Sequence, residues 1–440
     1  MTKDCRWLSM VPCLEVPERF LRGSKEENSI SVLVDVFVCV CRMNGLKHIL
    51  LVNYEYPPLG GGGGVITRDF AETLATRVQV TVLTSGYAGL KPEEKNGNLC
   101  IIRVPVWGRS QGPVASLASM LSFFPKSLYA GHRLMGMERF DLVHSFFAIP
   151  SGPSGLLLAR RGGVPHVLSV LGGDIYDPSK TLSPHRTPFL KLTVKWVING
   201  SDRTVAESED LVTRTREIFG TKSIDRIPLA FKPVVFRRID RKNLGLGLRE
   251  ADIVLIAVGR LVERKGIEQL IKILSKINDP RVQLVVVGDG PLRNKLTVQS
   301  EEAGVAKRVH FTGFVSDQRK WELLSNADLF VSTTAHEGFG IVFLEAMESG
   351  LPIVSYNCGG HVDFLTKDIA YLIPVGNISL FRETVIRLGE NGDLRKRMGE
   401  TAREEAKKYH IEVFTDRYVK LYQECLESHR ASNRSLAKVG

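Results

Sequence analysis

The chain has 440 residues, a formal net charge of +11 and 43% hydrophobic residues. This length predicts two or three domains, and the apolar content is ordinary for a globular protein with sizeable cores. No apolar run reaches the ~18 residues that a membrane-spanning helix needs. The seven cysteines show no spacing typical of a zinc site or a disulfide framework. Aromatic residues are not interleaved with Arg as on a nucleic-acid platform, so no nucleic acid partner is expected.

The first 42 residues differ from the rest of the chain. They hold four of the seven cysteines and balance six Lys/Arg against six Asp/Glu, so the whole net charge lies in residues 43–440. Met43 then opens MNGLKHILLVNYEYPP, which is typical of a first core strand. We interpret residues 1–42 as an N-terminal extension outside the core fold, with a misassigned start as one explanation. An unusual signal and a lipid-interacting arm compete with it, although the acidic stretch before the apolar run makes a poor signal.

Short apolar runs alternate with helical patterns along the remaining chain, which predicts an α/β protein with parallel sheets covered by helices. The predicted strands of the first series are His48–Val52, Gln79–Leu83, Ile101–Val104, Leu142–Ser145, His166–Val170 and Arg203–Ala206. The predicted helices between them are Ile66–Arg77, Ser116–Met137, Pro188–Asn199 and Ser208–Phe219.

A second series of strands follows a break in the apolar rhythm between Pro228 and Leu248. Its predicted strands are Ile253–Val258, Gln283–Val287, Val309–Phe311, Leu329–Ser332 and Ile353–Ser355. We therefore predict one Rossmann-like domain at 43–230 and another at 231–410. Residues 411–440 are predicted to form a last helix, at 411–428, and then a basic tail. Two doubly wound domains in sequence predict a central cleft between the carboxyl ends of their sheets, where ligands bind.

The segment from His336 to Gly360 reads HEGFGIVFLEAMESGLPIVSYNCGG and carries the strongest functional signal. Glu337 and Glu345 stand eight positions apart, with Gly338 and Gly340 directly after the first glutamate. This pattern predicts a loop whose backbone N–H groups are left bare at a helix N-terminus, an arrangement that favours anions. The alternative is a surface loop before an ordinary amphipathic helix, with Glu345 in solvent.

This segment resembles the E-x7-E signature of the family 4 retaining glycosyltransferases, and the resemblance extends from about Lys47 to about Ser428. It implies the GT-B fold, with two doubly wound Rossmann-like domains facing a central cleft, an acceptor domain first and a nucleotide-sugar domain second. In such proteins the first glutamate contacts the donor sugar and the second binds the ribose, which implies these roles for Glu337 and Glu345. The resemblance also implies that backbone amides hold the sugar and the diphosphate, here those of Gly338, Phe339, Gly340 and Ile341.

Two cations follow the first strand of the second series. Arg260 and Lys265 bracket a short loop before a predicted helix at Ile267, and a helix N-terminus with two cations favours a diphosphate. The resemblance implies that this Arg and Lys bind the donor phosphates and neutralise the leaving group. The alternative is a solvent-facing pair with Glu263.

Other matching segments extend the predicted site. The resemblance places the nucleobase at HFTGFVSD, residues 310–317, which includes Phe314. A run of five glycines, of which Gly62, Gly63 and Gly64 are the last three, precedes the predicted helix at Ile66. The resemblance implies that this run forms a loop against the donor phosphates and the acceptor. The alternative is a plain flexible loop.

The segment VLSVLGGDIYDP departs from the family pattern, because Leu171 stands where relatives often carry a histidine. Asp174 in this segment is a candidate contact for an acceptor hydroxyl. A helix N-cap or an Asx turn explains it equally well.

Between Arg103 and Arg203 there are twelve Lys/Arg against five Asp/Glu, an excess suited to an anionic donor, an anionic acceptor or a lipid surface. A solvated basic face explains this excess equally well. Within this stretch, the amphipathic segment Ser116–Phe140 is typical of an interfacial membrane helix. It is equally typical of a core-facing helix with a basic outer side, which is the reading we favour.

Together these features predict a retaining glycosyltransferase that moves a sugar from a nucleotide-diphosphate donor to a sugar, lipid-linked or small-molecule acceptor. The sequence contains no Asp-x-Asp pair, so the chemistry is expected to need no metal and no cofactor. We expect a cytoplasmic protein, with peripheral contact to an anionic membrane as an open alternative. Two other functions stay open, a nucleotide-sugar epimerase of the same fold and an inactive binding subunit.

Overall fold

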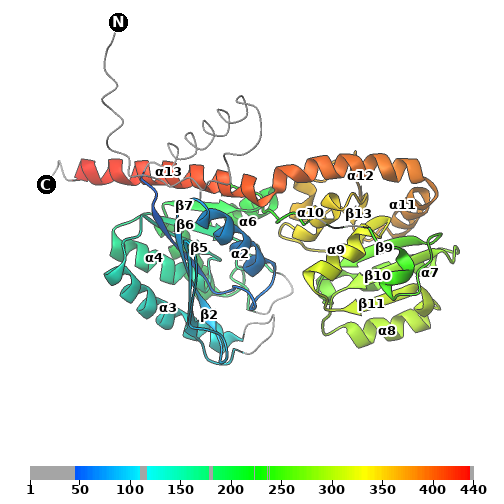
Figure 1. The fold of residues 1–440 in the computed structure, drawn as a ribbon, viewed down its shortest axis with the longest axis horizontal. Helices are drawn as coiled ribbons and strands as arrows, with labels where there is room; N and C mark the ends of the chain where they lie inside the picture. Colours follow the sequence, from blue (N-terminus) through cyan, green and yellow to red (C-terminus); the bar gives the residue numbers. More distant parts are fainter. Residues whose placement is uncertain are drawn as a thin grey trace, which may run out of the picture. The chain divides into compact units, whose positions relative to one another are not determined.

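A computed structural model describes residues 45–109, 116–177, 182–221, 223–234, 236 and 238–436 (Figure 1). The predicted extension at 1–42 and the last four residues of the predicted basic tail lie outside these ranges. Two separate sheets organise the described chain, one built from residues 48–226 and the other from residues 253–373. The prediction of an α/β protein with two doubly wound halves is confirmed.

The first sheet has eight strands in the order β3-β4-β2-β1-β5-β6-β7-β8, and only β3 runs antiparallel to its neighbour. All six strands predicted for this half are present. Two further strands were not predicted, because β3 has the sequence EEKN without an apolar residue and β8 has only two residues. The strands are β1 His48–Asn53, β2 Gln79–Gly86, β3 Glu93–Asn96, β4 Leu99–Pro105, β5 Leu142–Phe146, β6 His166–Val170, β7 Arg203–Ala206 and β8 Asp225–Arg226.

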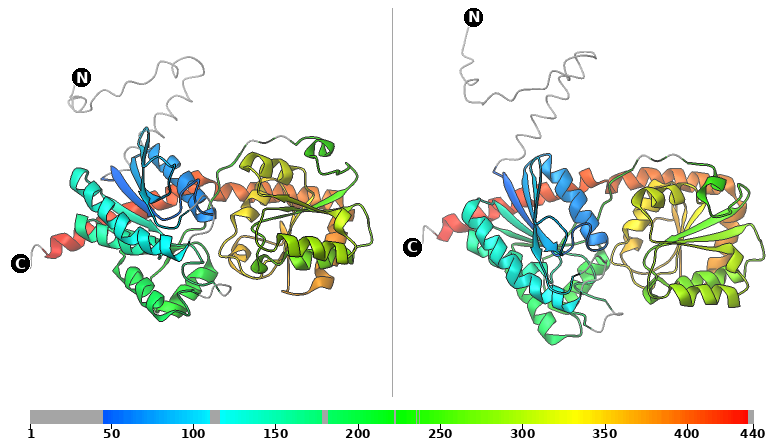
Figure 2. Two further views of the ribbon diagram at one scale, coloured as in Figure 1. Left: turned by 90° about the horizontal axis from the view of Figure 1, so that it is seen from below. Right: turned by 60° about the horizontal axis from the view of Figure 1, so that its bottom comes forward.

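Helices cover both faces of this sheet, with α3 and α4 on one face and α2 on the other (Figures 1 and 2). Four were predicted, although α2 begins at Gly62 rather than at Ile66. The N–H groups of the first turn of a helix donate no hydrogen bond within the helix. The glycines form this turn of α2. The fifth, α4, was missed because SGPSGLLLARRG is rich in helix breakers. The helices are α2 Gly62–Ala75, α3 Leu117–Met137, α4 Ser151–Gly162, α5 Pro188–Gly200 and α6 Glu209–Phe219.

The small residues of α4 have a packing role. A Cβ added to Gly155 would lie only 1.8 Å from the Ser145 hydroxyl on β5. Glycine at this position lets the helix lie directly on the sheet. Packing thus outweighs the low helix propensity of the segment.

The second sheet has six parallel strands in the order β11-β10-β9-β12-β13-β14, around a core of Ile, Leu and Val side chains. Its strands are β9 Ile253–Val258, β10 Val282–Val287, β11 Val309–Gly313, β12 Leu329–Ser332, β13 Ile353–Tyr356 and β14 Ala370–Ile373. Its helices are α7 Ile267–Ser275, α8 Arg293–Glu302, α9 Asp317–Ser325, α10 Ile341–Glu348, α11 Ile378–Glu390 and α12 Gly392–Ala406.

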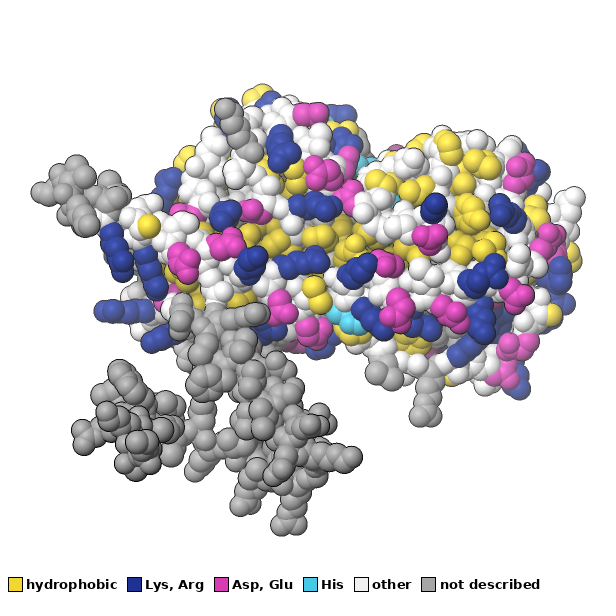
Figure 3. Space-filling view, turned by 90° about the horizontal axis from the view of Figure 1, so that it is seen from above, with side chains coloured by type: hydrophobic (Ala, Val, Ile, Leu, Met, Phe, Trp, Pro, Cys, Tyr) yellow, Lys and Arg dark blue, Asp and Glu magenta, His cyan; other side chains and the backbone are white. Residues whose placement is uncertain are grey.

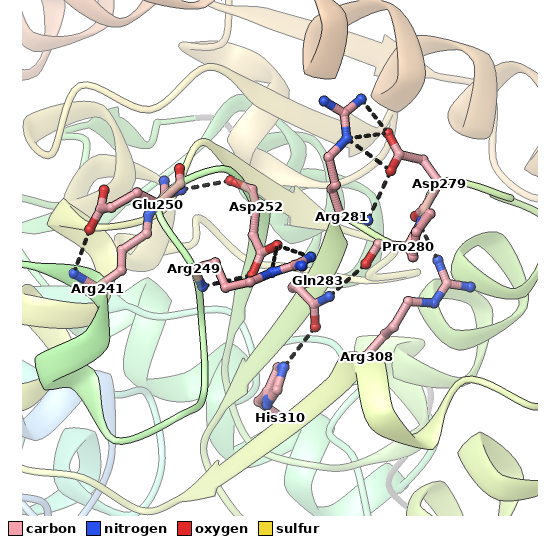
Figure 4. A network of polar contacts seen from close by, with 10 residues as sticks. All are labelled: Arg241, Arg249, Glu250, Asp252, Asp279, Pro280, Arg281, Gln283, Arg308 and His310. Atoms are coloured by element: carbon pink, nitrogen blue, oxygen red, sulfur yellow. Dashed lines mark hydrogen bonds and ion pairs between the residues drawn. The ribbon is translucent and has the colours of Figure 1, made fainter.

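A polar network at the amino-terminal ends of these strands anchors the segment that follows the first domain (Figure 4). The Arg241 side chain is 2% exposed and pairs with Asp328 at 2.8 Å. It also donates to the carbonyl oxygens of Glu250, Asp252 and Asn326. A buried guanidinium needs this many acceptors, so Arg241 fixes the short 3-10 helix Arg241–Leu244 to the start of β9.

The last helix, α13, spans Ile411–Leu436 and extends beyond the predicted end at residue 428. Its buried hydroxyl groups bond to the first sheet, Tyr418 to Ser169 Oγ at 2.7 Å and Tyr422 to His144 Nδ1 at 2.5 Å. Figure 3 looks onto α12 and α13 and shows basic and acidic side chains interspersed over this face. None of the helices in the described ranges has the length and apolarity that crossing a membrane requires.

Candidate functional site

Two loops at the carboxyl end of the second sheet form the candidate site. The loop after β9 carries Arg260 and Lys265, and the loop after β12 carries Glu337. β9 and β12 are neighbours, but the strands that follow them in sequence lie on opposite sides, β10 beyond β9 and β13 beyond β12. Such a switch point is where doubly wound sheets bind ligands.

Lys265 and Glu337 meet across this switch point. The Lys265 ammonium group donates a hydrogen bond to Oε2 of Glu337, and a guanidinium nitrogen of Arg264 lies 4.0 Å from Oε1. The Lys265 and Glu337 side chains are only 14% and 13% exposed. Burial alone would raise the pKa of Glu337, but the charges of Lys265 and Arg264 outweigh it and lower the pKa below its ordinary value. Glu337 is therefore held as a carboxylate, and the alternative pairing of Lys265 with Glu263 is wrong.

The turn after Glu337 is closely packed. Gly360 N–H donates to the Glu337 carbonyl at 2.9 Å, and a Cβ on Gly359 would lie 2.4 Å from the same oxygen. Gly340 precedes α10 with a φ of +89° and provides no side-chain cap. The first N–H groups of α10 therefore point out of the turn without a side-chain acceptor, in the manner of an anion site.

Arg260 lies two residues beyond the end of β9 and is exposed. Its guanidinium group forms no ion pair or hydrogen bond with any residue that the structure describes. The side chain is therefore available to an anionic ligand at the same end of the sheet.

Glu345 is buried on α10 and is 8% exposed, so the alternative that places it in solvent is wrong. Its Oε1 accepts a hydrogen bond from the Lys320 ammonium group at 2.6 Å, while Oε2 is buried without any partner in the part of the chain that the structure describes. Burial raises the pKa of Glu345 above its ordinary value, against the lowering effect of Lys320. A buried acceptor without a donor is rare, and a bound hydroxyl group would satisfy it.

The glycine run of the first domain approaches α10. A Cβ on Gly62 would lie 3.8 Å from the Ile341 side chain, so the N-terminal turns of α2 and α10 lie side by side. Gly63 contacts the Phe147 ring, which a Cβ would approach to 2.4 Å. Phe147 has a φ of 71°, a strained conformation for a bulky residue, and it directly follows β5. Gly64 packs against the Leu59 carbonyl group, where a Cβ would lie 3.1 Å away.

Asp174 and Phe314 have different surroundings. Asp174 is 5% exposed, and its two oxygens accept hydrogen bonds from Leu171 N–H at 2.9 Å and from Ala148 N–H at 2.5 Å. These contacts favour the turn-bracing interpretation of Asp174 over contact with an acceptor. Phe314, just after β11, is 89% exposed, so its ring is open to a ligand.

Sequence reasoning missed Glu207, which directly follows β7. Its side chain is buried, and a Cβ on Gly338 would lie 2.4 Å from its Oε1. Burial raises the pKa of Glu207 well above its ordinary value, and the nearby carboxylates of Asp174 and Glu337 add to this effect. The available signal was its position, since a polar residue that directly follows a buried parallel strand lies at the ligand-binding edge.

A cavity of about 760 Å³ lies elsewhere in the second domain, between the interdomain segment and α12. It is lined by Val234, Phe236 and Arg403 among others, and by none of the predicted site residues. The site is thus defined by its polar geometry rather than by this cavity.

Comparisons with known proteins show the family of the chain. The family model described as Glycosyl transferases group 1 matches residues 239–405, and Glycosyltransferase Family 4 matches residues 60–232. The N-acetyl-alpha-D-glucosaminyl L-malate synthase of Bacillus anthracis is 25% identical over 391 residues, which are 85% of this chain and 97% of that protein.

Solved structures share the fold at lower identity. A sucrose-phosphate synthase from Thermosynechococcus elongatus superposes with a TM-score of 0.76 at 20% identity, over 87% of this chain and 100% of that one. HepE of Anabaena in complex with UDP-glucose gives a TM-score of 0.66 at 19% identity, over 87% of this chain and 99% of that one. The chain belongs to the family 4 glycosyltransferases, with the GT-B fold.

Proposed function

We propose that the protein transfers a sugar from a nucleoside-diphosphate donor to an acceptor hydroxyl, with retention of configuration at the anomeric carbon. The observation that carries this proposal is the pairing of Lys265 with Glu337 beside the uncapped N-terminus of α10. A cation, a carboxylate and bare amides within one turn match the charges of a sugar diphosphate as its glycosidic bond breaks.

In this mechanism the bond between the anomeric carbon and the phosphate oxygen breaks as negative charge develops on the diphosphate. Arg260, Lys265 and the amides of 338–341 stabilise that charge, which is electrostatic catalysis. Glu337 positions the sugar and supports the positive charge that develops at the anomeric carbon. The acceptor oxygen attacks from the face of the leaving group, and its proton passes to the departing phosphate oxygen. No dedicated protein base is then required.

We assign the nucleoside to the α9–α10 side of this site. Glu345 is proposed to accept hydrogen bonds from the ribose hydroxyl groups, since one of its oxygens is buried without a donor among the described residues. The exposed Phe314 ring is proposed to lie against the base. HepE of Anabaena binds UDP and UDP-glucose, so UDP-sugars are the first donors to test.

The proposed reaction needs no metal ion. Arg260 and Lys265 supply two positive charges where a divalent ion would otherwise neutralise the diphosphate. Turnover in the presence of a chelator tests this, and full activity in EDTA is the expected result. A loss of activity that Mg²⁺ or Mn²⁺ restores would contradict it.

The acceptor is proposed to bind to the first domain, beside the turn that contains Gly62, Gly63 and Gly64. The Phe147 ring and Leu171 line this turn. Asp174 is proposed to hold the loop that carries Leu171 in place, and to affect the acceptor only through that loop.

The second proposed partner is a lipid surface. It is proposed to contact the outer faces of α3 and α5. Among the described residues, ten of sixteen exposed large apolar side chains lie between residues 107 and 196, including Leu121 and Phe189 at 64% and 72% exposed. Neither helix contains Asp or Glu, and Lys191 and Lys195 are exposed on α5. Apolar side chains mixed with cations suit an anionic membrane and a lipid-linked acceptor.

The experiment that tests the proposed function incubates the protein with labelled UDP-, GDP- and ADP-sugars, with and without candidate acceptors. Sugar transfer with an α-linked product from an α-linked donor is the expected outcome. Conversion of the donor sugar to its epimer without any acceptor would identify the protein as an epimerase. Nucleotide binding without turnover of any donor would identify it as a binding subunit.

A further inference from the structure

Glu207 is a buried carboxyl group at the meeting point of the two domains. It follows β7, and Ser208 after it caps α6 by accepting a hydrogen bond from Leu211 N–H at 3.2 Å. The Glu207 residue is only 4% exposed. Its position is therefore set by a strand on one side and a capped helix on the other, which leaves the side chain little freedom.

Two glycines, one from each domain, make room for this carboxyl group. A Cβ would lie 2.4 Å from Glu207 Oε1 if added to Gly338, and 3.3 Å from it if added to Gly172. Gly338 is the residue directly after Glu337, so the first domain brings Glu207 to the turn that is proposed to hold the donor sugar.

Glu207 has no partner of its own among the residues that the structure describes. The two carboxylates near it are both accounted for, because Glu337 pairs with Lys265 and Asp174 accepts hydrogen bonds from backbone amides. Tyr418 of α13, another titratable neighbour, shares a hydrogen bond with the Ser169 hydroxyl. The Glu207 carboxyl group is therefore available for a hydrogen bond to a ligand.

We propose that Glu207 is a specificity-determining residue that forms a hydrogen bond with one hydroxyl group of the transferred sugar, from the side opposite Glu337. This inference rests on the proposed glycosyltransferase function and adds a contact from the first domain to the donor sugar. A protonated carboxyl group both donates and accepts, as a sugar hydroxyl does, so the two groups match.

The charge state of the site supports this assignment. Burial and the charges of Asp174 and Glu337 raise the pKa of Glu207 well above its ordinary value, which favours the protonated form of the group. Lys265 is engaged by Glu337, with Arg264 on the far oxygen of the same carboxylate. As pH rises through the raised pKa, Glu207 loses its proton and its ability to donate a hydrogen bond.

The test compares the wild-type protein with Glu207→Gln and Glu207→Ala. The control is Glu209→Gln, an exposed glutamate two residues further along. Donors are nucleotide sugars with one base that differ by removal or inversion of a single hydroxyl group. The wild type should discriminate against one of these analogues by about tenfold or more in kcat/KM, the equivalent of one hydrogen bond to a buried polar group.

In Glu207→Ala this discrimination should fall to about twofold or less, whereas Glu207→Gln and Glu209→Gln should retain most of it. The affinity for the free nucleoside diphosphate should be unchanged in all three variants. In the wild type, kcat/KM should decline as pH rises through the raised pKa of Glu207, and in Glu207→Gln this decline should be absent. Retained discrimination in Glu207→Ala, in a wild type that does transfer sugar, would overturn the proposal. An inactive wild type would instead refute the proposed function itself.

Discussion

The Lys265 ammonium group and the Glu337 carboxylate form a buried ion pair between positions 72 residues apart in the chain. The pair joins the loops after β9 and β12, the two strands at which the sheet order reverses. Because each partner compensates the charge of the other, removing either one leaves a buried charge beside the proposed diphosphate site.

Replacing either partner should lower kcat by orders of magnitude without unfolding the protein. Lys265→Ala removes a cation from the leaving group, and Glu337→Gln removes the carboxylate beside the anomeric carbon. Each change should lower kcat by ~10²–10³-fold, the range found for loss of one preorganised electrostatic contact. Circular dichroism should remain that of the wild type. Lys272→Ala, which removes an exposed lysine of α7, serves as the control, and wild-type rates in both site variants would refute the assigned roles.

The second glutamate of the signature should act on nucleotide affinity rather than on the chemical step. Glu345→Gln removes the negative charge that ribose hydroxyl groups are proposed to meet. The dissociation constant for UDP, measured by titration calorimetry, should rise by about tenfold, or 1.4 kcal/mol. The exposed Glu400→Gln on α12 should leave it unchanged. An unaltered UDP affinity in Glu345→Gln would remove Glu345 from the nucleotide site.

Gly338 should tolerate no side chain. An alanine methyl group there would lie 2.4 Å from Glu207, which itself packs at the domain boundary. Gly338→Ala is therefore expected to lower kcat/KM by at least about tenfold, as small displacements of a reacting group do. Gly136→Ala in α3 is the matched control, because nothing lies within 4 Å of its added methyl group. That control should be neutral or gain about 0.5–1 kcal/mol in stability.

The lowered pKa of Glu337 makes one contribution to stability depend on pH. The folded protein holds the carboxylate ionised below the ordinary pKa of 4.5, so Glu337 contributes to stability above that value. The contribution is lost as pH falls through the lowered folded-state pKa. Denaturant unfolding of the wild type and Glu337→Gln should show the largest difference in unfolding free energy near neutral pH. A difference that grows toward acid pH would contradict the ionised state.

The outer faces of α3 and α5 should bind anionic membranes. The wild type should co-sediment with vesicles that contain phosphatidylglycerol, but not with pure phosphatidylcholine, and high salt should weaken the binding. A Leu121→Glu, Phe189→Glu double variant should lose this binding and keep its UDP affinity. Val298→Glu on α8, 51% exposed in the second domain, is the control. Equal sedimentation of the double variant would refute this surface.

The predictions of strands are confirmed where apolar runs were uninterrupted. Elements were missed where tertiary contacts determine whether the element forms. The predicted limits of β6, β7, β9 and β12 agree with the structure, because each is a buried run. β3 exists only through pairing with β4, and α4 exists because its glycines fit against the sheet, so neither has a local signal. The low helix propensity of glycine predicts a loop for the glycine run. Propensity does not take into account that the N–H groups of a first helical turn have no acceptor within the helix.

The site residues also divide into those with a local sequence signal and those that depend on tertiary contacts. The E-x7-E spacing and the strand-end cations were readable along the chain, so Glu337, Glu345, Arg260 and Lys265 could be proposed from sequence. The ion pair between these side chains could not be predicted from the sequence, since the partner of Lys265 stands 72 residues away. Glu207 escaped notice because its burial against Gly338 depends on contact between two domains.

A diphosphate is proposed to bind between the loop after β9 and the turn at residues 338–341. A crystal structure with a bound UDP-sugar, or the corresponding sugar for another base that binds, tests it most directly. Phosphate oxygens are expected about 3 Å from the Arg260 guanidinium, the Lys265 ammonium group and backbone N–H groups at the start of α10. A diphosphate bound elsewhere, with Arg260 and Lys265 directed away from that turn, would contradict it.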